Sequence, residues 1–442
     1  MTTTDRPLRV AVVGGGPAGL YTADALTFDP DSNATVDILE RLPVPFGLLR
    51  YGVAPDHLTM KLAVNSLQEV LDRPSVRLFC NVEIGRDIAV EELRRHYDAV
   101  VYATGADADN RLAIPGEDLT GSSSATSFVK WYNGHPEAMD FDLSRASTVG
   151  VIGAGNVALD VTRILVKQAE ELRNTDIDEA TLVALAASTV TDVHIFIRRG
   201  AEFAKFTTKE LRELGELHDV DIVVDPEHVP ADDAGELGAV AKRNIALLRA
   251  WSGRTPTGAT RRIHFHFSTR PTEILGEQSV RAIRVERSGT DDCRDIPVDM
   301  ILRAVGYRSR PIVGVPFSDE TATIPHEDHR VIRDGAPQRG EYAVGWAKRG
   351  PSGVLGTNRS DAEATAGSVF DDRVELLMQR TEDFGGALNL LTTRGTRFLD
   401  NEAWNTIADR EIQLGTIHGR QRIKIRSWDE LVAAGSPAFT PS

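Results

Sequence analysis

The stretch "VGVIGAGNVALDVTRIL" occupies residues 149–165 and decides the fold class of this chain. An apolar strand, a glycine turn and a helix follow one another in it, with Gly153, Gly155 and Ala158 in the pattern G-x-G-x-x-A. In such a turn the first glycine makes the tight bend and the second lets a pyrophosphate approach the backbone. The third small residue lets the helix pack closely on the strand. The stretch therefore predicts an α/β unit that binds a dinucleotide.

A second copy of this pattern, "VAVVGGGPAGL", lies at residues 10–20, with Gly14, Gly16 and Gly19 in the pattern G-x-G-x-x-G. The next predicted strand, "TVDILE" at 35–40, ends on Glu40. An acidic residue at this place holds a ribose 2′-hydroxyl. A free 2′-hydroxyl indicates either NAD or the AMP half of FAD.

The strand that follows the turn at 153–158 ends differently. It reads "DVHIFIRR" at 192–199 and closes on Arg198 and Arg199. Guanidinium groups form charge-assisted, often bidentate bonds to phosphate, so this end favours the 2′-phosphate of NADP. The alternative is that both arginines only solvate the end of a strand. The first turn thus suits FAD and the second suits NADP(H).

Composition narrows the class of protein. The 442 residues allow two or three domains, and no apolar run is long enough for a membrane span. A net charge of −15 argues against general nucleic-acid binding. No targeting peptide is recognisable, so we expect a cytoplasmic location. The two cysteines exclude a disulfide framework, a C-x-x-C pair and a cysteine-ligated iron–sulfur cluster.

Further motifs extend over most of the chain. Two predicted strands close on A-[TV]-G, and four other stretches are distinctive: "LPVPFGLLRYGVAPDH" (42–57), "GAGNVALDVTRIL" (153–165), "FTTKELREL" (206–214) and "VGWAKRGPSGVLGTN" (344–358). Together they resemble the adrenodoxin-reductase-type ferredoxin–NADP reductases. The resemblance implies an α/β fold with two Rossmann-like, glutathione-reductase-like domains. It places an NADP(H)-binding domain, 108–324, inside a discontinuous FAD-binding domain, 1–107 plus 325–442.

The resemblance also implies which residues bind the cofactors. For FAD these are Gly14, Gly16, Ala18, Gly19, Glu40, Leu48, Ile84, Trp346, Gly353, Val354 and Leu355. For NADP(H) they are Arg111, Asn156, Val157, Ala158, Leu159, Arg198, Arg199 and Glu210, with Gly353 in addition. Trp346 stands where the general flavoprotein pattern has an aspartate. His57 and Glu213 would lie near the flavin ring and position groups or handle protons.

The implied reaction is electron transfer between NADPH and a ferredoxin-type iron–sulfur protein, with hydride transfer to flavin N5 followed by two one-electron steps. The alternatives are an FAD- and NADPH-dependent monooxygenase and a nucleotide-binding redox sensor without catalysis. Ferredoxins are acidic, so the basic residues Lys242, Arg243 and Arg249, with Arg254, Arg261 and Arg262 nearby in sequence, form a possible docking patch. A solvated helix face explains the same residues equally well.

Two smaller signals have structural alternatives. In "APDH" (54–57), Asp56 is a plausible N-cap for a helix at 58–71. In "RRIHFHF" (261–267), His264 and His266 fall on one face of a strand. A metal site there lacks a third ligand in the sequence, so we expect an exposed strand face and no metal.

Overall fold

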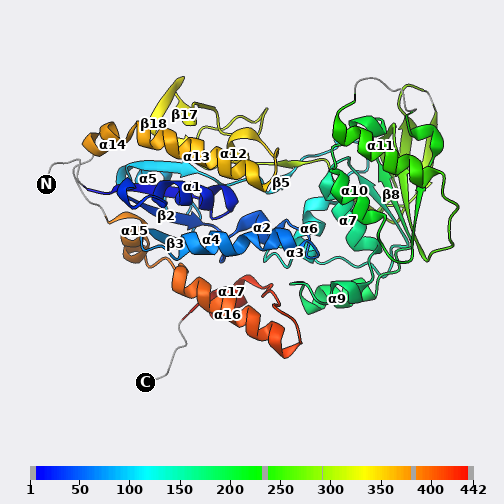
Figure 1. The fold of residues 1–442 in the computed structure, drawn as a ribbon, viewed down its shortest axis with the longest axis horizontal. Helices are drawn as coiled ribbons and strands as arrows, with labels where there is room; N and C mark the ends of the chain where they lie inside the picture. Colours follow the sequence, from blue (N-terminus) through cyan, green and yellow to red (C-terminus); the bar gives the residue numbers. More distant parts are fainter. Residues whose placement is uncertain (1–5, 231–236, 291, 380–384, 437–442) are drawn as a thin grey trace. The chain divides into compact units, whose positions relative to one another are not determined.

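The computed structural model describes residues 6–230, 237–290, 292–379 and 385–436. These residues form two compact units. Figure 1 shows them with colours that follow the residue number. The first unit contains the residues up to 53, 57–108 and those from 307 onward, and the second contains 54–56 and 109–306. The chain therefore returns to the first unit earlier than the predicted boundary at 324/325, and the short segment 54–56 belongs with the second unit. Strands β5 (Ala108–Asp109) and β15 (Tyr307–Arg308) lie where the chain passes between the units.

A seven-stranded sheet in the order β16-β17-β18-β4-β1-β2-β3 forms the centre of the first unit. Its strands are β1 (Leu8–Val13), β2 (Ala34–Glu40), β3 (Val76–Cys80), β4 (Ala99–Tyr102), β16 (His326–Glu327), β17 (Arg330–Arg333) and β18 (Ala336–Ala343). The five strands from β18 to β3 are parallel, and β16 and β17 add an antiparallel edge. In β1, Val10 and Val12 face one core while Ala11 and Val13 face another. Burial on both faces explains why this strand is continuously apolar.

Helices cover both faces of this sheet. They are α1 (Pro17–Thr27), α2 (Gly47–Tyr51), α3 (Leu58–Lys61), α4 (Ala63–Leu71), α5 (Val90–His96), α12 (Trp346–Arg349), α13 (Leu355–Asp371), α14 (Arg373–Gln379), α15 (Gly386–Arg394), α16 (Asn401–Ile417) and α17 (Trp428–Ala434). Helices α1, α4, α13 and α16 share one core, and α5 and α15 share the other. Helix α13 packs along α1, as Figure 1 shows.

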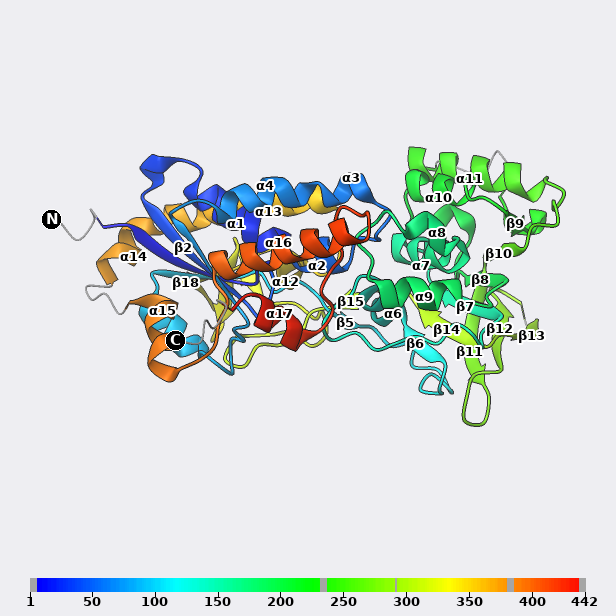
Figure 2. The same cartoon turned by 90° about the horizontal axis from the view of Figure 1, so that it is seen from below.

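The second unit is built on six parallel strands in the order β6-β14-β7-β8-β10-β9. They are β6 (Ser122–Ser124), β7 (Thr148–Ile152), β8 (Asp192–Phe196), β9 (Val220–Val224), β10 (Arg261–His266) and β14 (Met300–Arg303). Its helices are α6 (Ala125–Tyr132), α7 (Asn156–Val166), α8 (Ala169–Leu172), α9 (Glu179–Ala186), α10 (Thr208–Leu214) and α11 (Ala239–Ser252). An antiparallel sheet of β11 (Thr269–Leu275), β12 (Ala282–Arg287) and β13 (Cys293–Pro297) packs against the strands, as Figure 2 shows.

One detail differs from the sequence predictions. The helix expected at 58–71 is interrupted at Leu62 and forms α3 and α4. Between α8 and β8 the chain forms the short helix α9, which Asp178 caps by accepting the backbone N–H of Thr181. In the part of the chain that the structure describes, no helix is both long and apolar enough to span a bilayer.

Candidate functional site: two dinucleotide turns

The first glycine turn joins β1 to α1, and its glycines serve two purposes. A Cβ on Gly14, whose φ is +112°, would lie 2.5 Å from the carbonyl oxygen of Ala103. A Cβ on Gly19 would lie 2.0 Å from the carbonyl oxygen of Gly14. Both glycines are therefore required by packing. A Cβ on Gly16 would meet only the Cα of Gly47, at 3.9 Å. The backbone at Gly16 is thus open to a ligand, as a bound pyrophosphate needs.

Glu40, at the end of β2, fastens this turn. Its Oε2 accepts the backbone N–H of Gly15 at 2.7 Å, and its Oε1 accepts that of Leu42 at 2.8 Å. Burial raises the pKa of Glu40, and these two hydrogen bonds oppose the shift. A carboxylate offers about four lone-pair sites, so ribose hydroxyls can still bind here. The sequence predicted that Glu40 contacts a ribose, but it did not predict these two hydrogen bonds.

The loop before α2 lies against the same turn. The N–H of Phe46, whose φ is 80°, donates to the carbonyl of Gly15 at 2.8 Å. A Cβ on Gly47 would lie 3.1 Å from the Cα of Gly16. Leu48 follows in α2 and is half-buried. The loop therefore brings Leu48, one of the expected FAD residues, close to the first turn.

The residue that precedes Trp346, one of the expected FAD residues of the C-terminal part, also meets this turn. A Cβ on Gly345 would lie 2.6 Å from that of Ala18, at the start of α1. The next residue, Trp346, donates its indole N–H to the carbonyl of Ser352 at 3.0 Å. Asp361 on α13, which the sequence analysis did not single out, accepts the N–H of Gly345 at 2.7 Å.

The other residues expected to bind FAD lie in different surroundings. Gly353, with φ +86°, and the exposed Val354 precede Leu355, the first residue of α13. Ile84 follows β3 and pairs with Ile88. Its link to the turn is indirect, because the N–H of Val82 donates to the carbonyl of Glu40.

The second glycine turn, between β7 and α7, repeats the packing of the first, although Gly153 does not share the positive φ of Gly14. A Cβ on Gly153 would lie 2.4 Å from the carbonyl oxygen of Ala304, whereas a Cβ on Gly155 would meet nothing within 4 Å. Asn156 starts α7, and its Oδ1 accepts the N–H of Thr207 at 2.8 Å. Val157 is half-buried, and Ala158 and Leu159 are buried in the core of the second unit. The open position again lies at the middle glycine.

Arg198 and Arg199 follow β8 with exposed side chains. Among the described residues neither guanidinium has a salt-bridge partner, although that of Arg199 lies 5.6 Å from the ring centroid of Phe203. Both arginines line a pocket of about 720 Å³, together with Phe203, the β11–β12 hairpin and the turn after it. Phe203 is 53% exposed. A cationic pocket beside an aromatic ring suits a phosphate and a base.

Glu210 and Arg111 already have partners. Glu210 accepts a hydrogen bond from the hydroxyl of Thr207 at 3.0 Å, and its N–H donates back to that hydroxyl at 3.4 Å, which caps α10. Arg111 is exposed and lies 2.6 Å from the carboxylate of Asp118 and 3.6 Å from that of Glu117. Any ligand of Arg111 therefore competes with these acids.

The predicted capping role of Asp56 is wrong. Its carboxylate accepts from Nε and Nη2 of Arg163 at 2.8 and 3.0 Å and from Nζ of Lys167 at 3.1 Å. Although burial raises the pKa of Asp56, the hydrogen bonds and positive charges of Arg163 and Lys167 together outweigh it and the pKa is lowered. Arg163, in the last turn of α7, and Lys167, directly after the end of this helix, hold Asp56 there. No side chain caps α3.

His57 and Glu213 lie in different units. His57 is buried and stands at the N-terminal end of α3. Glu213 on α10 lies 3.7 Å from Arg163 and 3.8 Å from Lys209. Their shared role at a flavin ring stays a prediction.

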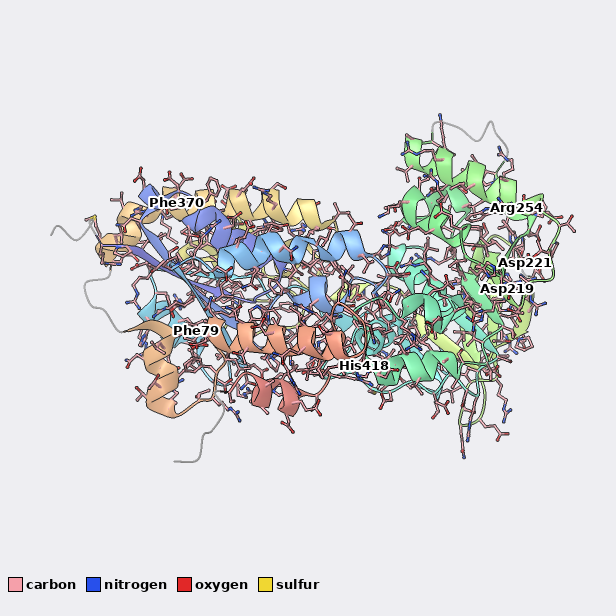
Figure 3. All side chains as sticks on the ribbon, turned by 60° about the horizontal axis from the view of Figure 1, so that its bottom comes forward. Phe79, Asp219, Asp221, Arg254, Phe370 and His418 are labelled. Atoms are coloured by element: carbon pink, nitrogen blue, oxygen red, sulfur yellow. The ribbon has the colours of Figure 1, made fainter. Side chains whose placement is uncertain are left out.

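Only part of the predicted basic patch is free of internal bonds. Lys242 and Arg243 on α11 are exposed. Arg249 donates to the carbonyl of Pro230, Arg261 to that of Lys167 and Arg262 to Asp192. Figure 3 shows the exposed Arg254 at the same end of the second unit as Asp219, which directly precedes β9, and Asp221 on β9. Lys242 and Arg243 are therefore exposed, whereas Arg249, Arg261 and Arg262 also make bonds within the unit.

A third histidine joins His264 and His266. His194 on β8 stacks on His264 with ring centroids 4.4 Å apart, and its Nδ1 lies 2.9 Å from Nε2 of His266. Asp192 lies 2.8 Å from Nε2 of His264. We call His264, His194 and His266 the histidine stack. Within the described ranges, no three histidine, cysteine or acidic side chains are arranged to hold a metal ion.

Known proteins share this architecture. The sequence pattern of the pyridine nucleotide-disulphide oxidoreductase family matches residues 8–237. The chain is 40% identical to the NADPH-ferredoxin reductase FprA of Mycobacterium tuberculosis, over 97% of this chain and 99% of that protein. It is 36% identical to the mitochondrial NADPH:adrenodoxin oxidoreductase of Arabidopsis thaliana, over 98% and 97%. The chain belongs to the adrenodoxin-reductase-type ferredoxin–NADP reductase family.

Solved structures support the assignment of the chain to this family. The Mycobacterium tuberculosis FprA structure in complex with NADPH superposes with a TM-score of 0.92 at 39% identity, over 97% of this chain and all of that one. A thioredoxin reductase from T. acidophilum, at 17% identity and a TM-score of 0.50 over 84% of this chain, shows only that the fold is shared. The predicted α/β fold with two dinucleotide-binding domains is confirmed.

Proposed function

We propose that this enzyme oxidises NADPH and passes the electrons to a ferredoxin-type iron–sulfur protein, with FAD in the first unit and NADP(H) in the second. One observation carries the proposal. Two glycine turns, each packed closely at its first glycine and open at its middle glycine, are followed by Glu40 in one unit and by Arg198 and Arg199 in the other. The names of the similar proteins FprA and adrenodoxin oxidoreductase support it.

In the first unit the open backbone at Gly16 and the start of α1 receive the FAD pyrophosphate. Glu40 binds the ribose while it holds Gly15 in place. The other predicted contacts with FAD come from residues of the first unit. These residues are Gly14, Ala18, Gly19, Leu48, Ile84, Trp346, Gly353, Val354 and Leu355. The N-terminus of α13 offers backbone N–H groups to the electron-rich part of the cofactor.

In the second unit the open backbone at Gly155 receives the pyrophosphate of NADP(H). Arg198 and Arg199 recognise the 2′-phosphate. Asn156, Val157, Ala158 and Leu159 line the start of α7, and Arg111 and Glu210 complete the set in this unit. Gly353, which belongs to the first unit, stays a predicted NADP(H) contact. A chain that held NAD instead would gain nothing from two arginines at this point.

When bound, the flavin accepts a hydride from NADPH and releases electrons one at a time. The protein orients the nucleotides, and His57 and Glu213 position groups and handle protons beside the ring. Cys80 is buried, which raises the pKa of its thiol, and Cys293 is exposed. With only these two cysteines the chain has no C-x-x-C pair for a dithiol relay. The electrons therefore leave to an external acceptor.

Lys242 and Arg243 form the centre of the surface that attracts the acidic iron–sulfur partner. The Arg249 guanidinium supports the adjoining backbone rather than the partner. The expected cytoplasmic location stays a prediction.

Anaerobic mixing tests the proposal. We expect NADPH to bleach the flavin absorbance of the holoenzyme, and an added ferredoxin to restore it while becoming reduced. A long-lived oxygen adduct of the flavin on admission of air would instead indicate a monooxygenase, and failure to bleach would indicate a redox sensor. Replacing Arg198 and Arg199 by Ala tests the cofactor, since affinity for NADPH should fall and affinity for NADH should not. A charge-assisted hydrogen bond of this kind contributes about 1.5–3 kcal/mol.

A further inference from the structure

The pocket that contains Arg198 and Arg199 has a second source of positive charge. Among the described residues that line it, four are arginines and one is a glutamate, so these residues carry three net positive charges in a chain whose net charge is −15. Arg270 and Arg287, from the β11–β12 hairpin, supply the two additional arginines. A concave site of one sign attracts a ligand of the opposite sign. The pocket therefore suits an anion with a high negative charge, because it offers more positive charge than Arg198 and Arg199 alone.

The two hairpin arginines differ in the strength of their ion pairs with nearby glutamates. The guanidinium of Arg270 lies 2.5 Å from Oε2 of Glu286, the glutamate that also lines the pocket. This pair is locally neutral. The guanidinium of Arg287 lies 3.5 Å from Glu227, whose side chain is 74% exposed. Ion pairs as exposed as this one hold their partners weakly. Arg287 is thus the hairpin cation that an incoming anion can recruit.

The backbone next to Arg287 is fixed to the segment that carries Arg198. The hydroxyl of Ser288 donates to the carbonyl of Arg198 at 2.8 Å, and the N–H of Ser288 donates to the carbonyl of Ser268 at 2.7 Å. The N–H of Thr290 donates back to the carbonyl of Arg287 at 3.1 Å and closes the turn. The main chain at Arg287 is therefore held beside Arg198, while its side chain, 42% exposed, can still move.

We propose that Arg287 is a third residue that recognises the 2′-phosphate of NADP(H). Selectivity against NADH then depends on Arg287 as well as on Arg198 and Arg199. This inference rests on the proposed function, since it assumes that the second unit holds the nucleotide. On binding, the guanidinium of Arg287 exchanges the exposed carboxylate of Glu227 for a phosphate dianion, which accepts charge-assisted, bidentate bonds.

Binding of nucleotide fragments to the FAD-loaded protein tests Arg287 directly. The probes are adenosine 2′,5′-bisphosphate and 5′-AMP, which differ only in the 2′-phosphate, and titration calorimetry measures both affinities. We expect Arg287→Gln to weaken the bisphosphate about tenfold, the loss of one charge-assisted contact, and to leave 5′-AMP unchanged. Arg287→Lys, which keeps the charge, should retain most of the affinity for the bisphosphate.

Arg284→Gln is the matched control. Arg284 lies on the same strand, is partly exposed and pairs with Asp295 and Glu273, each at 2.8 Å, but it does not line the pocket. We expect this variant to bind both probes as the parent does. Thermal unfolding of each variant checks that the hairpin is intact.

The outcomes separate this inference from the proposed function. Unchanged binding of both probes by Arg287→Gln overturns the inference, and so does an equal loss for both probes. If replacing Arg198 and Arg199 by Ala also leaves bisphosphate binding unchanged, the assignment of NADP(H) to this pocket fails as well. If that double variant loses affinity for the bisphosphate while Arg287→Gln does not, only the role of Arg287 is wrong.

Discussion

The guanidinium of Arg50 on α2 is buried against the carboxylate of Glu411 on α16, 361 residues further along the chain. Nη1 lies 3.1 Å from Oε2, Nη2 contacts Oε1, and the two side chains are 4% and 0% exposed. Burial by itself lowers the pKa of Arg50, but the nearby Glu411 carboxylate more than compensates and the pKa is raised. The guanidinium of Arg50 therefore stays charged. Phe46, just before α2, also packs on Trp404 of α16, with ring centroids 5.5 Å apart. Helix α16 thus supports the loop that meets the first glycine turn.

Removal of one member of this pair should be costly. Glu411→Gln leaves the charge of Arg50 buried without a counter-charge, and we expect the free energy of unfolding to fall by about 3–5 kcal/mol. The double variant Arg50→Met, Glu411→Leu replaces the pair by apolar side chains and should recover most of this loss. Urea unfolding of the FAD-free protein measures both. A single variant as stable as the parent would show that the pair contributes nothing.

In each turn, replacement of the first glycine by alanine should impair folding, whereas replacement of the middle glycine should impair only cofactor binding. Gly14→Ala and Gly153→Ala place a methyl group against a carbonyl oxygen, so we expect poor folding. Gly16→Ala and Gly155→Ala add a methyl group where no protein atom blocks it. These variants should fold but lose FAD and NADPH binding, respectively. Flavin content and NADPH titration distinguish them, and a Gly16→Ala protein with full flavin content would contradict the expectation.

Phe203 should act on the part of the nucleotide that NADPH and NADH share. We expect its exposed ring to stack on adenine, a contact of about 1–3 kcal/mol per base. Phe203→Ala should then weaken NADPH and NADH to the same extent and leave their ratio unchanged. Steady-state reduction of ferricyanide gives the two KM values. Phe28→Ala is the control, because Phe28 is also exposed and also lies beside an arginine, but in the first unit.

The histidine stack should make the second unit sensitive to acid. Burial, with the nearby His264, lowers the pKa of His194 to about 4. Burial, with the nearby His194, lowers the pKa of His266 to about 3. Both rings are neutral when folded but titrate near 6.5 when unfolded, so the unfolded chain binds more protons as the pH falls. The free energy of unfolding should be fully retained above pH 6.5 and should decline from there to about pH 3, where His266 is also protonated in the folded state.

Replacement of a titrating ring tests this pH dependence. His266→Phe keeps an aromatic ring beside Phe196, whose centroid lies 5.0 Å from that of His266, and should flatten the decline. His218→Gln, at an exposed histidine of the same unit, should not. Urea unfolding at a series of pH values gives the curves, and parallel curves for all three proteins would refute the role of the stack.

The docking surface should be sensitive to charge reversal. Lys242→Glu with Arg243→Glu should lower kcat/KM for ferredoxin about tenfold at low salt, because steering is lost, and should weaken its dependence on salt. Reduction of ferricyanide by NADPH should not change. Arg281→Glu, which alters an exposed arginine of the hairpin, is the control. An unaltered salt dependence in the double variant would place the docking surface elsewhere.

Local patterns in the sequence predicted much of the fold and of the site. A strand, a glycine turn and a helix are adjacent in sequence, so both turns, together with Glu40 and the pair Arg198 and Arg199, could be recognised. Contacts between distant segments could not. Arg287 shares a pocket with Arg198 only because β11 and β12 return to the end of β8. Asp56 looked like a helix cap because nothing nearby in sequence shows that Arg163 would hold it.

The pair formed by Arg50 and Glu411 also bears on how the enzyme is made. Chains fold as they leave the ribosome, from the N-terminus onward. The second unit has all its residues once position 306 has emerged, whereas the first unit still lacks β18, α13 and α16. The loop at Phe46 gains its support only when α16 has been synthesised. Loading of flavin should therefore be one of the last steps of biogenesis and should report that translation has passed residue 411.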